Sequence, residues 1–280
     1  MRILVTGAAG SIGRVVTLGL GDRGHDVVGL DLVPEPDGFT GPRHTADCSD
    51  ARAVQAVFAD ERLDAVVHLA GHPGEADLPT SLTSHVITTA ALLDACVAHR
   101  VSRFVYASSN HAVGRTPRAS TAEGVISDDA LPRPDTFYGV GKVAAEALMR
   151  LYADRHSIDA IACRIGSFLD EPGTTRALST WLSHEDCVRM VEAALTASSP
   201  GFAVLYGISN NTPAWWDLEP GRRLGYDPVD DAEAYADHVA VRDVDDAEAA
   251  HVGGPFAGEE FYRPALGNQG LTSSALEGGH

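Results

Sequence analysis

The chain has 280 residues, of which 44% are hydrophobic, and it carries a formal net charge of −18. This length allows a full hydrophobic core, either in one large domain or in one domain with a smaller appendage. The acidic balance argues against sequence-independent binding to nucleic acid or to an anionic membrane surface, because both need a basic footprint. We therefore expect a soluble globular protein.

Targeting and redox features favour the cytoplasm. The first residues enter a glycine loop without the charged, apolar and cleavage regions of a signal peptide, and no apolar run approaches the length of a bilayer. Four cysteines lie far apart in apolar segments, at positions 48, 96, 163 and 187. This pattern favours buried reduced thiols over disulfides or a metal site.

The first sixty residues or so alternate between apolar strands and amphipathic helices. A β-branched strand over Ile3–Thr6 passes through a glycine turn into a helix over Arg14–Leu20, and a second strand over His25–Leu30 ends at Asp31. These elements make a βαβ unit of ordinary length. We expect a short third strand at residues 43–47 and a helix at about residues 50–59.

The alternation continues to residue 166. We expect strands at residues 63–69, 103–107 and 158–165, a long helix at 78–99, and a loop from residue 110 to residue 134. Asp135 is a good N-cap for a further helix that runs to about Arg155. Strands and helices at this spacing predict an α/β fold with a doubly wound parallel sheet, whose ligands bind beyond the carboxyl ends of the strands.

The regular alternation weakens after Gly166, so we divide the chain into residues 1–166, 167–242 and 243–280. The second part reads as a small substrate-binding lobe, with a helix from the capping box at Ser183 to Leu195 and a strand over Phe202–Ile208. Short helices are expected at residues 215–225 and 230–238. The acidic, glycine-rich last part predicts an extended wrap or a loose tail.

A glycine motif lies at the first strand end. Gly7, Gly10 and Gly13 surround Ser11 and Ile12, and they open the first helix. The missing side chains allow a tight turn, close approach of the backbone to a pyrophosphate, and close packing of helix on strand. A glycine-rich turn without a ligand is the alternative, but the strand before it and the helix after it favour a dinucleotide. Residues 1–166 are thus expected to be a Rossmann domain.

The second strand end indicates which dinucleotide is bound. Asp31 comes 18 residues after Gly13, and a carboxylate there accepts hydrogen bonds from a ribose and repels a 2′-phosphate. The following Leu32 and Val33 offer no arginine for such a phosphate, so the sequence favours NAD over NADP. Asp47 follows the third strand and either reaches the adenine edge or caps the next helix.

A proton-transfer group is predicted on the helix after Asp135. Tyr138 and Lys142 are four residues apart, so they share a helix face, and Ser109 ends the fifth strand. A phenol titrates near pKa 10, so it needs a nearby cation to act as a base at neutral pH. Lys142 is the only lysine among 21 basic residues. This makes a surface Tyr–Lys pair the weaker interpretation.

Together these motifs resemble extended short-chain dehydrogenases/reductases over residues 1 to about 166. The resemblance rests on the glycine trio, Asp31, His68-Leu69-Ala70-Gly71, Ser108-Ser109 and Tyr-x-x-x-Lys. Four further segments resemble uronate dehydrogenases and extend the match to about residue 240: residues 108–111, 164–167, 176–181 and 215–217. The resemblance implies NAD-dependent oxidation of D-glucuronate or D-galacturonate at C1 to the aldarolactone.

The resemblance also implies roles for individual residues. Tyr138 would be the general base, Lys142 its activator and ribose anchor, and Ser109 a second donor to the C1 oxygen. Leu69, Ala70, Gly71 and Ile165 would contact NAD. Asn110, His111, Ser167 and the loop at Pro73 would contact the sugar, and Arg176 its carboxylate. Long helices at residues 78–99 and 135–155 commonly pair subunits in this family, which implies a homo-oligomer.

Three departures from the family pattern leave alternatives open. His85 stands where an asparagine is usual and Gly141 where a serine precedes the lysine, while Pro73 replaces a serine that contacts sugar. The alternatives are an NAD-dependent dehydrogenase of a neutral or phosphorylated aldose, such as glucose 6-phosphate, and a non-catalytic NAD-binding regulator. A nucleotide-sugar epimerase is less favoured, because the lobe after Gly166 is short for a nucleotide diphosphate.

Overall fold

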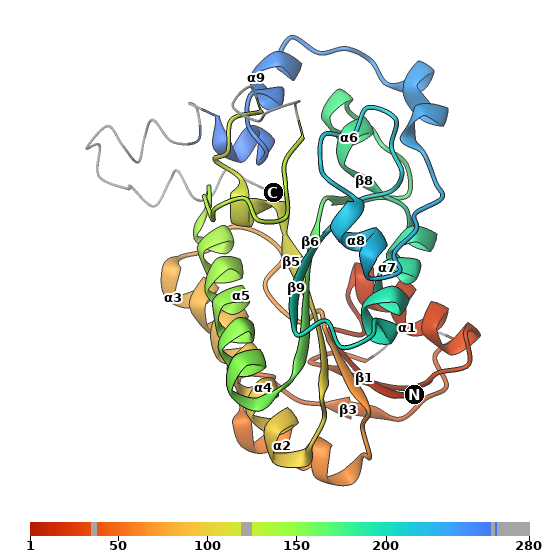
Figure 1. The fold of residues 1–280 in the computed structure, drawn as a ribbon, viewed down its shortest axis with the longest axis vertical. Coiled ribbons are helices and arrows are strands. Elements are labelled where there is room, and N and C mark those ends of the chain that lie inside the picture. The colour runs from red at the N-terminus through yellow and green to blue at the C-terminus, as the bar shows by residue number, and fades with distance from the viewer. Residues whose placement is uncertain (35–37, 119–124, 259–260, 262–280) are drawn as a thin grey trace.

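The computed structural model describes residues 1–34, 38–118, 125–258 and 261, and its centre is a parallel sheet (Figure 1). Seven strands lie in the order β3-β2-β1-β4-β5-β6-β9, and every pairing in the sheet is parallel. The predicted doubly wound α/β fold is confirmed. The strands are β1 (Arg2–Thr6), β2 (Asp26–Asp31), β3 (Arg43–Thr45), β4 (Ala65–His68), β5 (Arg103–Ser109), β6 (Asp159–Ile165) and β9 (Phe202–Gly207).

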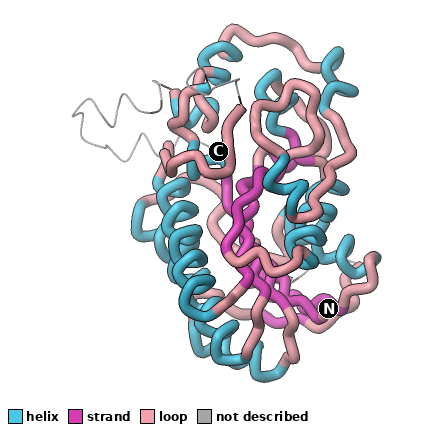
Figure 2. The backbone as a smooth tube through the Cα atoms, in the orientation of Figure 1, coloured by secondary structure: helices cyan, strands magenta, loops and turns pink. Residues whose placement is uncertain are grey.

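Helices cover both faces of the sheet (Figure 2). Successive strand residues point to opposite faces, so Ile3 and Val5 join one core cluster while Leu4 joins the other. Burial of each such side chain stabilises the fold by about 1.5–3 kcal/mol. The first face packs against α1 (Ser11–Asp22) and α7 (His184–Thr196), and the second against α2 (Ala51–Asp60), α4 (Thr88–His99) and α5 (Phe137–His156).

The strand order reverses direction between β1 and β4, which are neighbours in the sheet. Chain segments leave these two strands toward opposite faces, which opens a crevice at their carboxyl ends. The glycine loop follows β1 there, and Ser109 ends β5 two strands away. The topology therefore brings the predicted cofactor and proton-transfer motifs to one edge.

The predicted long helix at 78–99 is continuous but not uniform. It begins as α3 (Leu78–Leu82), passes through a π-helical turn over Thr83–Ile87, and continues as α4. By length and composition this helix is the one described segment that could cross a membrane, contrary to the expectation from the sequence, but half of its most apolar window is buried in the fold. A core helix passes the same test.

The helix that carries Tyr138 begins one residue later than predicted. Thr136, not Asp135, is the N-cap of α5, and its hydroxyl accepts a hydrogen bond from the Gly139 N–H at 2.9 Å. The Asp135 side chain is instead buried against His111. Both residue types are good caps, so the sequence alone did not separate them.

A smaller group of elements follows β6. A two-stranded sheet pairs β7 (Ser167–Phe168) with β8 (Trp181–Leu182), with α6 (Thr175–Thr180) between them. The helix expected at 215–225 is reduced to α8 (Glu219–Arg223), because the Trp215 carbonyl pairs with the Ile126 N–H like a strand residue. The helix expected at 230–238 is a 3₁₀ segment over Ala232–His238.

The C-terminal part returns across the carboxyl end of the sheet (Figure 1). It contains α9 (Asp245–Ala249) and a 3₁₀ turn over Gly254–Ala257. The Gly253 N–H donates to the Gly114 carbonyl at 2.9 Å, which ties this part to the loop after β5. The described portion thus contacts the loop after β5, and the rest of the predicted wrap or tail lies outside the described residues. All four cysteines are buried and free.

Candidate active site

The glycine loop exposes the N-terminus of α1 to the crevice. Gly7 has a φ of +69° and donates its N–H to the Leu30 carbonyl at 2.8 Å. A Cβ on Gly13 would lie 2.0 Å from the Gly7 carbonyl oxygen, so only glycine allows the helix to approach this closely. The free N–H groups of the first helical turn are suited to the pyrophosphate of a dinucleotide.

Asp31 is held rigidly at the end of β2. One carboxylate oxygen accepts the Ala9 N–H at 2.9 Å, and the other accepts the Leu32 N–H at 2.6 Å and the Val33 N–H at 3.2 Å. The oxygens keep further lone pairs for ribose hydroxyls. Asp47 does not cap the next helix, because the N-cap of α2 is Asp50. The Asp47 carboxylate instead accepts the Ser49 N–H at 2.8 Å in the preceding turn, and it faces the same crevice.

One cavity of about 1040 Å³ runs from Asp31 to Lys142, which is room for a dinucleotide. It is lined by every residue predicted to bind the cofactor and by Pro73 and Ser109. These are Gly7, Gly10, Ser11, Ile12, Gly13, Asp31, Leu32, Asp47, Leu69, Ala70, Gly71, Pro73, Ser109, Tyr138, Lys142 and Ile165. The glycine loop, the helix end and the fixed carboxylate therefore fit NAD.

The predicted proton-transfer group is assembled at one end of this cavity. The Lys142 ammonium lies 5.2 Å from the centre of the Tyr138 ring and donates to the Ala107 carbonyl at 2.7 Å. Burial raises the pKa of Tyr138, while its hydrogen bond with Ser109 acts in the opposite direction. Burial also lowers the pKa of Lys142 to about 7. A phenol, a hydroxyl and an ammonium thus line the same end of the cavity.

A buried carboxylate lies behind Lys142. Glu146 accepts a hydrogen bond from the Ser108 hydroxyl at 2.5 Å and receives the Arg164 guanidinium at 3.0 and 2.8 Å. Its charge raises the pKa of Lys142 against the effect of burial. Glu146 follows Lys142 by four residues, so the i, i+4 spacing that identified Tyr138 and Lys142 could have identified it too.

His85 and Gly141, the two helical residues that depart from the family pattern, pack against each other. His85 lies in the π-helical turn with its ring 5.0 Å from the Tyr138 ring, edge to face. A Cβ on Gly141 would lie 3.0 Å from the His85 Cδ2, so the glycine makes room for the imidazole. Burial and, to a smaller extent, the Lys142 charge lower the pKa of His85 to about 2. His85 is therefore a neutral ring beside Tyr138.

Within the described part of the chain, four of the residues predicted to contact the sugar are absent from the cavity lining. The Ser167 hydroxyl pairs with the Thr180 hydroxyl at 2.8 Å. Arg176 donates to the Val252 carbonyl at 2.7 Å, and Asn110 reaches the same carbonyl at 3.5 Å. Their sugar-binding roles stay predictions.

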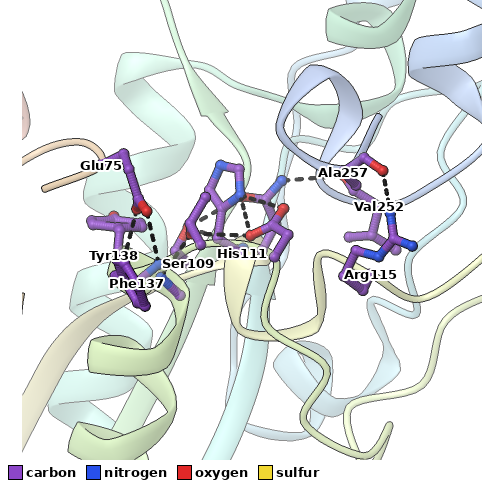
Figure 3. A network of polar contacts seen from close by, with 12 residues as sticks. Glu75, Ser109, His111, Arg115, Phe137, Tyr138, Val252 and Ala257 are labelled. Carbon is purple, nitrogen blue, oxygen red and sulfur yellow. Dashed lines mark hydrogen bonds and ion pairs between the residues drawn. The ribbon is translucent and has the colours of Figure 1, made fainter. Parts of the chain in front are cut away.

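His111, the fourth of these residues, lies beside the proton-transfer group. Its Nδ1 lies 2.8 Å from the Asp135 carboxylate, and its ring meets the Tyr138 ring edge to face at 5.8 Å (Figure 3). On its other side the ring lies 5.2 Å from the Phe256 ring. His111 is thus placed between the helix of Tyr138 and the C-terminal segment.

Sequence reasoning missed three groups around this site. Asp135 orients His111, and Glu75 accepts the backbone N–H groups of Phe137 and Tyr138. The Val252 carbonyl is the shared acceptor of Arg176 and Asn110. No motif marks Glu75 or Val252, because one acts on backbone amides and the other acts through a backbone carbonyl.

A dinucleotide cavity with this hydroxyl, phenol and ammonium at its end defines an NAD-dependent oxidoreductase acting on a CH–OH group. Residues 3–184 match the NAD dependent epimerase/dehydratase family, and the chain belongs to that family. A uronate dehydrogenase from Agrobacterium fabrum is 37% identical over 268 residues, which are 94% of this chain and 98% of the relative. This similarity also confirms the predicted resemblance to extended short-chain dehydrogenases/reductases.

Two further comparisons complete this picture. An NAD-dependent glucose-6-phosphate dehydrogenase from Haloferax volcanii is 34% identical, with 83% of this chain and 95% of the relative covered. The crystal structure of a uronate dehydrogenase mutant from Agrobacterium tumefaciens, complexed with NAD, superposes with a TM-score of 0.84 at 37% identity. That superposition covers 91% of this chain and 96% of the other.

Proposed function

We propose that the protein oxidises a hexuronate, D-glucuronate or D-galacturonate, at C1 to the aldarolactone. The observation that carries this proposal is the placement of Tyr138, Lys142 and Ser109 together at the end of the cavity that fits NAD. The similarity to uronate dehydrogenases over nearly the whole chain supports the sugar acid as substrate.

NAD, when bound, accepts the hydride that leaves C1. Tyr138 takes the proton of the C1 hydroxyl, and Ser109 donates a hydrogen bond to the same oxygen. Lys142 stabilises the Tyr138 phenolate by its charge. The ring oxygen stays bonded to C1, so the new carbonyl belongs to a lactone, and the hydride and proton account for both hydrogens removed.

Arg176 is the proposed partner of the substrate carboxylate. Its Nε has no hydrogen-bond partner within the described part of the chain, although one Nη is bonded to the Val252 carbonyl. A guanidinium has five N–H donors, so it can hold Val252 and still bind a carboxylate. Asn110 reaches the same Val252 carbonyl as Arg176, and His111 is its neighbour in sequence. These two residues are the proposed contacts for the sugar hydroxyls.

The second candidate is the oxidation of a neutral or phosphorylated aldose. The similarity to the glucose-6-phosphate dehydrogenase favours it, and so does Pro73, which lines the cavity without a hydroxyl. A guanidinium binds phosphate as well as carboxylate. We further propose a cytoplasmic homo-oligomer, on the grounds of the acidic charge, the buried free thiols and the two long helices.

The function is tested by NADH formation with glucuronate, galacturonate, glucose 6-phosphate and free aldoses side by side. The proposal expects the highest kcat/KM for a uronate, and activity on the other sugars alone would overturn it. Replacement Tyr138→Phe removes the base and is expected to lower kcat by roughly 10²- to 10⁴-fold while NAD still binds. Near-normal turnover of this variant would exclude Tyr138 as the base.

A further inference from the structure

The loop between β4 and α3 connects two parts of the cavity that are far apart in sequence. Gly71, His72 and Pro73 of this loop line the cavity. Two residues later, the Glu75 carboxylate accepts the Phe137 N–H and the Tyr138 N–H, each at 3.0 Å and each on its own oxygen (Figure 3). The loop is therefore bonded to the backbone of Tyr138 itself.

The N-terminus of α5 explains why a carboxylate is needed there. The first N–H groups of a helix have no partner within the helix, and the helix dipole favours a negative charge near them. Thr136 accepts the Gly139 N–H, which leaves the two preceding N–H groups to Glu75. Thr136 directly precedes the helix, whereas Glu75 comes from the loop between β4 and α3, 62 positions before Phe137.

The same loop has a second anchor on the opposite side of Pro73. The His72 N–H donates to the Ser84 hydroxyl at 2.5 Å, within the π-helical turn. Pro73 and Gly74 span the distance between the two anchors, and a Cβ on Gly74 would meet no atom within 4 Å. The position of Pro73 relative to Tyr138 is therefore set by the Ser84 and Glu75 contacts.

We infer that Glu75 is a positioning residue, which holds the loop of Pro73 at a fixed distance from Tyr138 and so sets the space in which the sugar meets the base. This inference rests on the proposed function, because it assigns the sugar to that space. Glutamine in place of Glu75 would keep the size but offer one acceptor oxygen, and its NH₂ group would face an N–H.

The contact itself is tested without any sugar, by amide hydrogen exchange in the full chain with NAD present. Glu75→Gln is expected to speed exchange at Phe137 or Tyr138, whichever loses its acceptor oxygen, by roughly ten- to hundred-fold, as the loss of a charge-assisted hydrogen bond predicts. The Gly139 amide, held by Thr136, is the internal control and should exchange at the original rate. Unchanged exchange at Phe137 and Tyr138 would overturn the inference.

The positioning role is tested by steady-state kinetics with the best uronate. Glu75→Gln is expected to lower kcat/KM for the sugar by roughly tenfold or more, with the KM for NAD unchanged. Asp77→Asn is the matched control, since it removes one charge from the same loop but keeps a good cap on α3. An equal loss in Asp77→Asn would mean a general charge effect and would overturn the positioning role.

A double-mutant cycle with Pro73→Ala separates positioning from simple capping of α5. If Glu75 places Pro73, the effect of Pro73→Ala on the sugar KM shrinks in the Glu75→Gln background. Additive effects would overturn the inference. If Glu75→Gln speeds exchange but the natural protein oxidises no uronate, the Glu75 contact is supported and the proposed function is refuted.

Discussion

Lys142 is buried although a lone ammonium is costly to remove from water. Its hydrogen bond to the Ala107 carbonyl and the charge of Glu146 offset part of this cost. The balance leaves the pKa of Lys142 at about 7, so small changes in its surroundings alter how much ammonium is present near neutral pH. Glu146, on the same helix as Tyr138 and Lys142, therefore acts on the base through the lysine.

Glu146→Gln is expected to move the alkaline limb of the pH profile of kcat to lower pH. Glu146 raises the pKa of Lys142, so its removal lowers that pKa, and the ammonium is lost earlier as the pH rises. The variant also leaves Arg164 unpaired, at a cost of about 3–5 kcal/mol of stability. The measurement is the pH dependence of kcat under conditions where the variant is folded.

Ser108→Ala is the matched variant for this experiment. It removes one hydrogen bond to Glu146 at 2.5 Å but keeps the carboxylate and its charge. Its alkaline limb should coincide with that of the natural protein. A shift of equal size in Ser108→Ala would show that packing, not the charge of Glu146, controls Lys142.

Residues with a chemical motif could be predicted from the sequence, and residues that act through the backbone could not. The glycine trio and Asp31 line one cavity with Tyr138 and Lys142, as their spacing predicts. The hydrogen-bond partners of the Glu75 carboxylate within the described part of the chain are Phe137 and Tyr138, which follow it by 62 and 63 positions. Only the folded chain shows such a contact.

At the scale of elements, α1 depends on one close approach. A Cβ on Gly13 would overlap the Gly7 carbonyl, and the helix would have to move away from β1. Gly13→Ala is expected to weaken NAD binding by roughly ten- to hundred-fold, or about 1.4–2.8 kcal/mol. Calorimetric titration with NAD measures this loss.

Gly21→Ala in the same helix is the control for Gly13→Ala. A Cβ there would meet no atom within 4 Å. Alanine in a helix interior stabilises by about 0.5–1 kcal/mol relative to glycine, so the Tm should rise slightly while NAD binds as before. Equal loss of NAD affinity in both variants would contradict the role of the close approach.

The order of elements followed from hydrophobic periodicity, but local details did not. Periodicity predicts one helix over 78–99, but it does not indicate the π-helical turn at Thr83–Ile87. The cap of α5 differs by one residue because Asp135 bonds His111 across the loop. The contact of Asp135 with His111 joins segments 24 positions apart, and short-range patterns do not record it.

At the scale of the whole molecule, the C-terminal segment contacts two of the proposed sugar-binding residues. The Val252 carbonyl receives Arg176, and Phe256 lies against His111. A Cβ on Gly253 would lie 1.7 Å from an Asp135 carboxylate oxygen, so the backbone passes directly over that side chain. Composition predicts an acidic wrap or tail here, but it does not show which residues the wrap contacts.

Gly253→Ala is expected to displace this segment and to raise the KM for the sugar, with the KM for NAD unchanged. Overpacking against Asp135 costs about 1–3 kcal/mol and disturbs the support of His111 and Arg176. Steady-state kinetics with each substrate varied in turn measures both constants. Gly173→Ala, where a Cβ meets no atom within 4 Å, should leave both constants unchanged, and a raised KM for NAD in Gly253→Ala would contradict the assignment.

The burial of the only lysine has a consequence for chemical labelling. Every other basic side chain counted with it is arginine, so the surface offers no ε-amine to acylating or cross-linking reagents. The α-amino group of Met1 lies beside His25 at the exposed N-terminus, and Figure 1 shows that end of the chain away from α5, the helix that carries Lys142. Attachment through Met1 would therefore present every copy in one orientation, and any modification of an ε-amine would report that the NAD cavity had admitted the reagent.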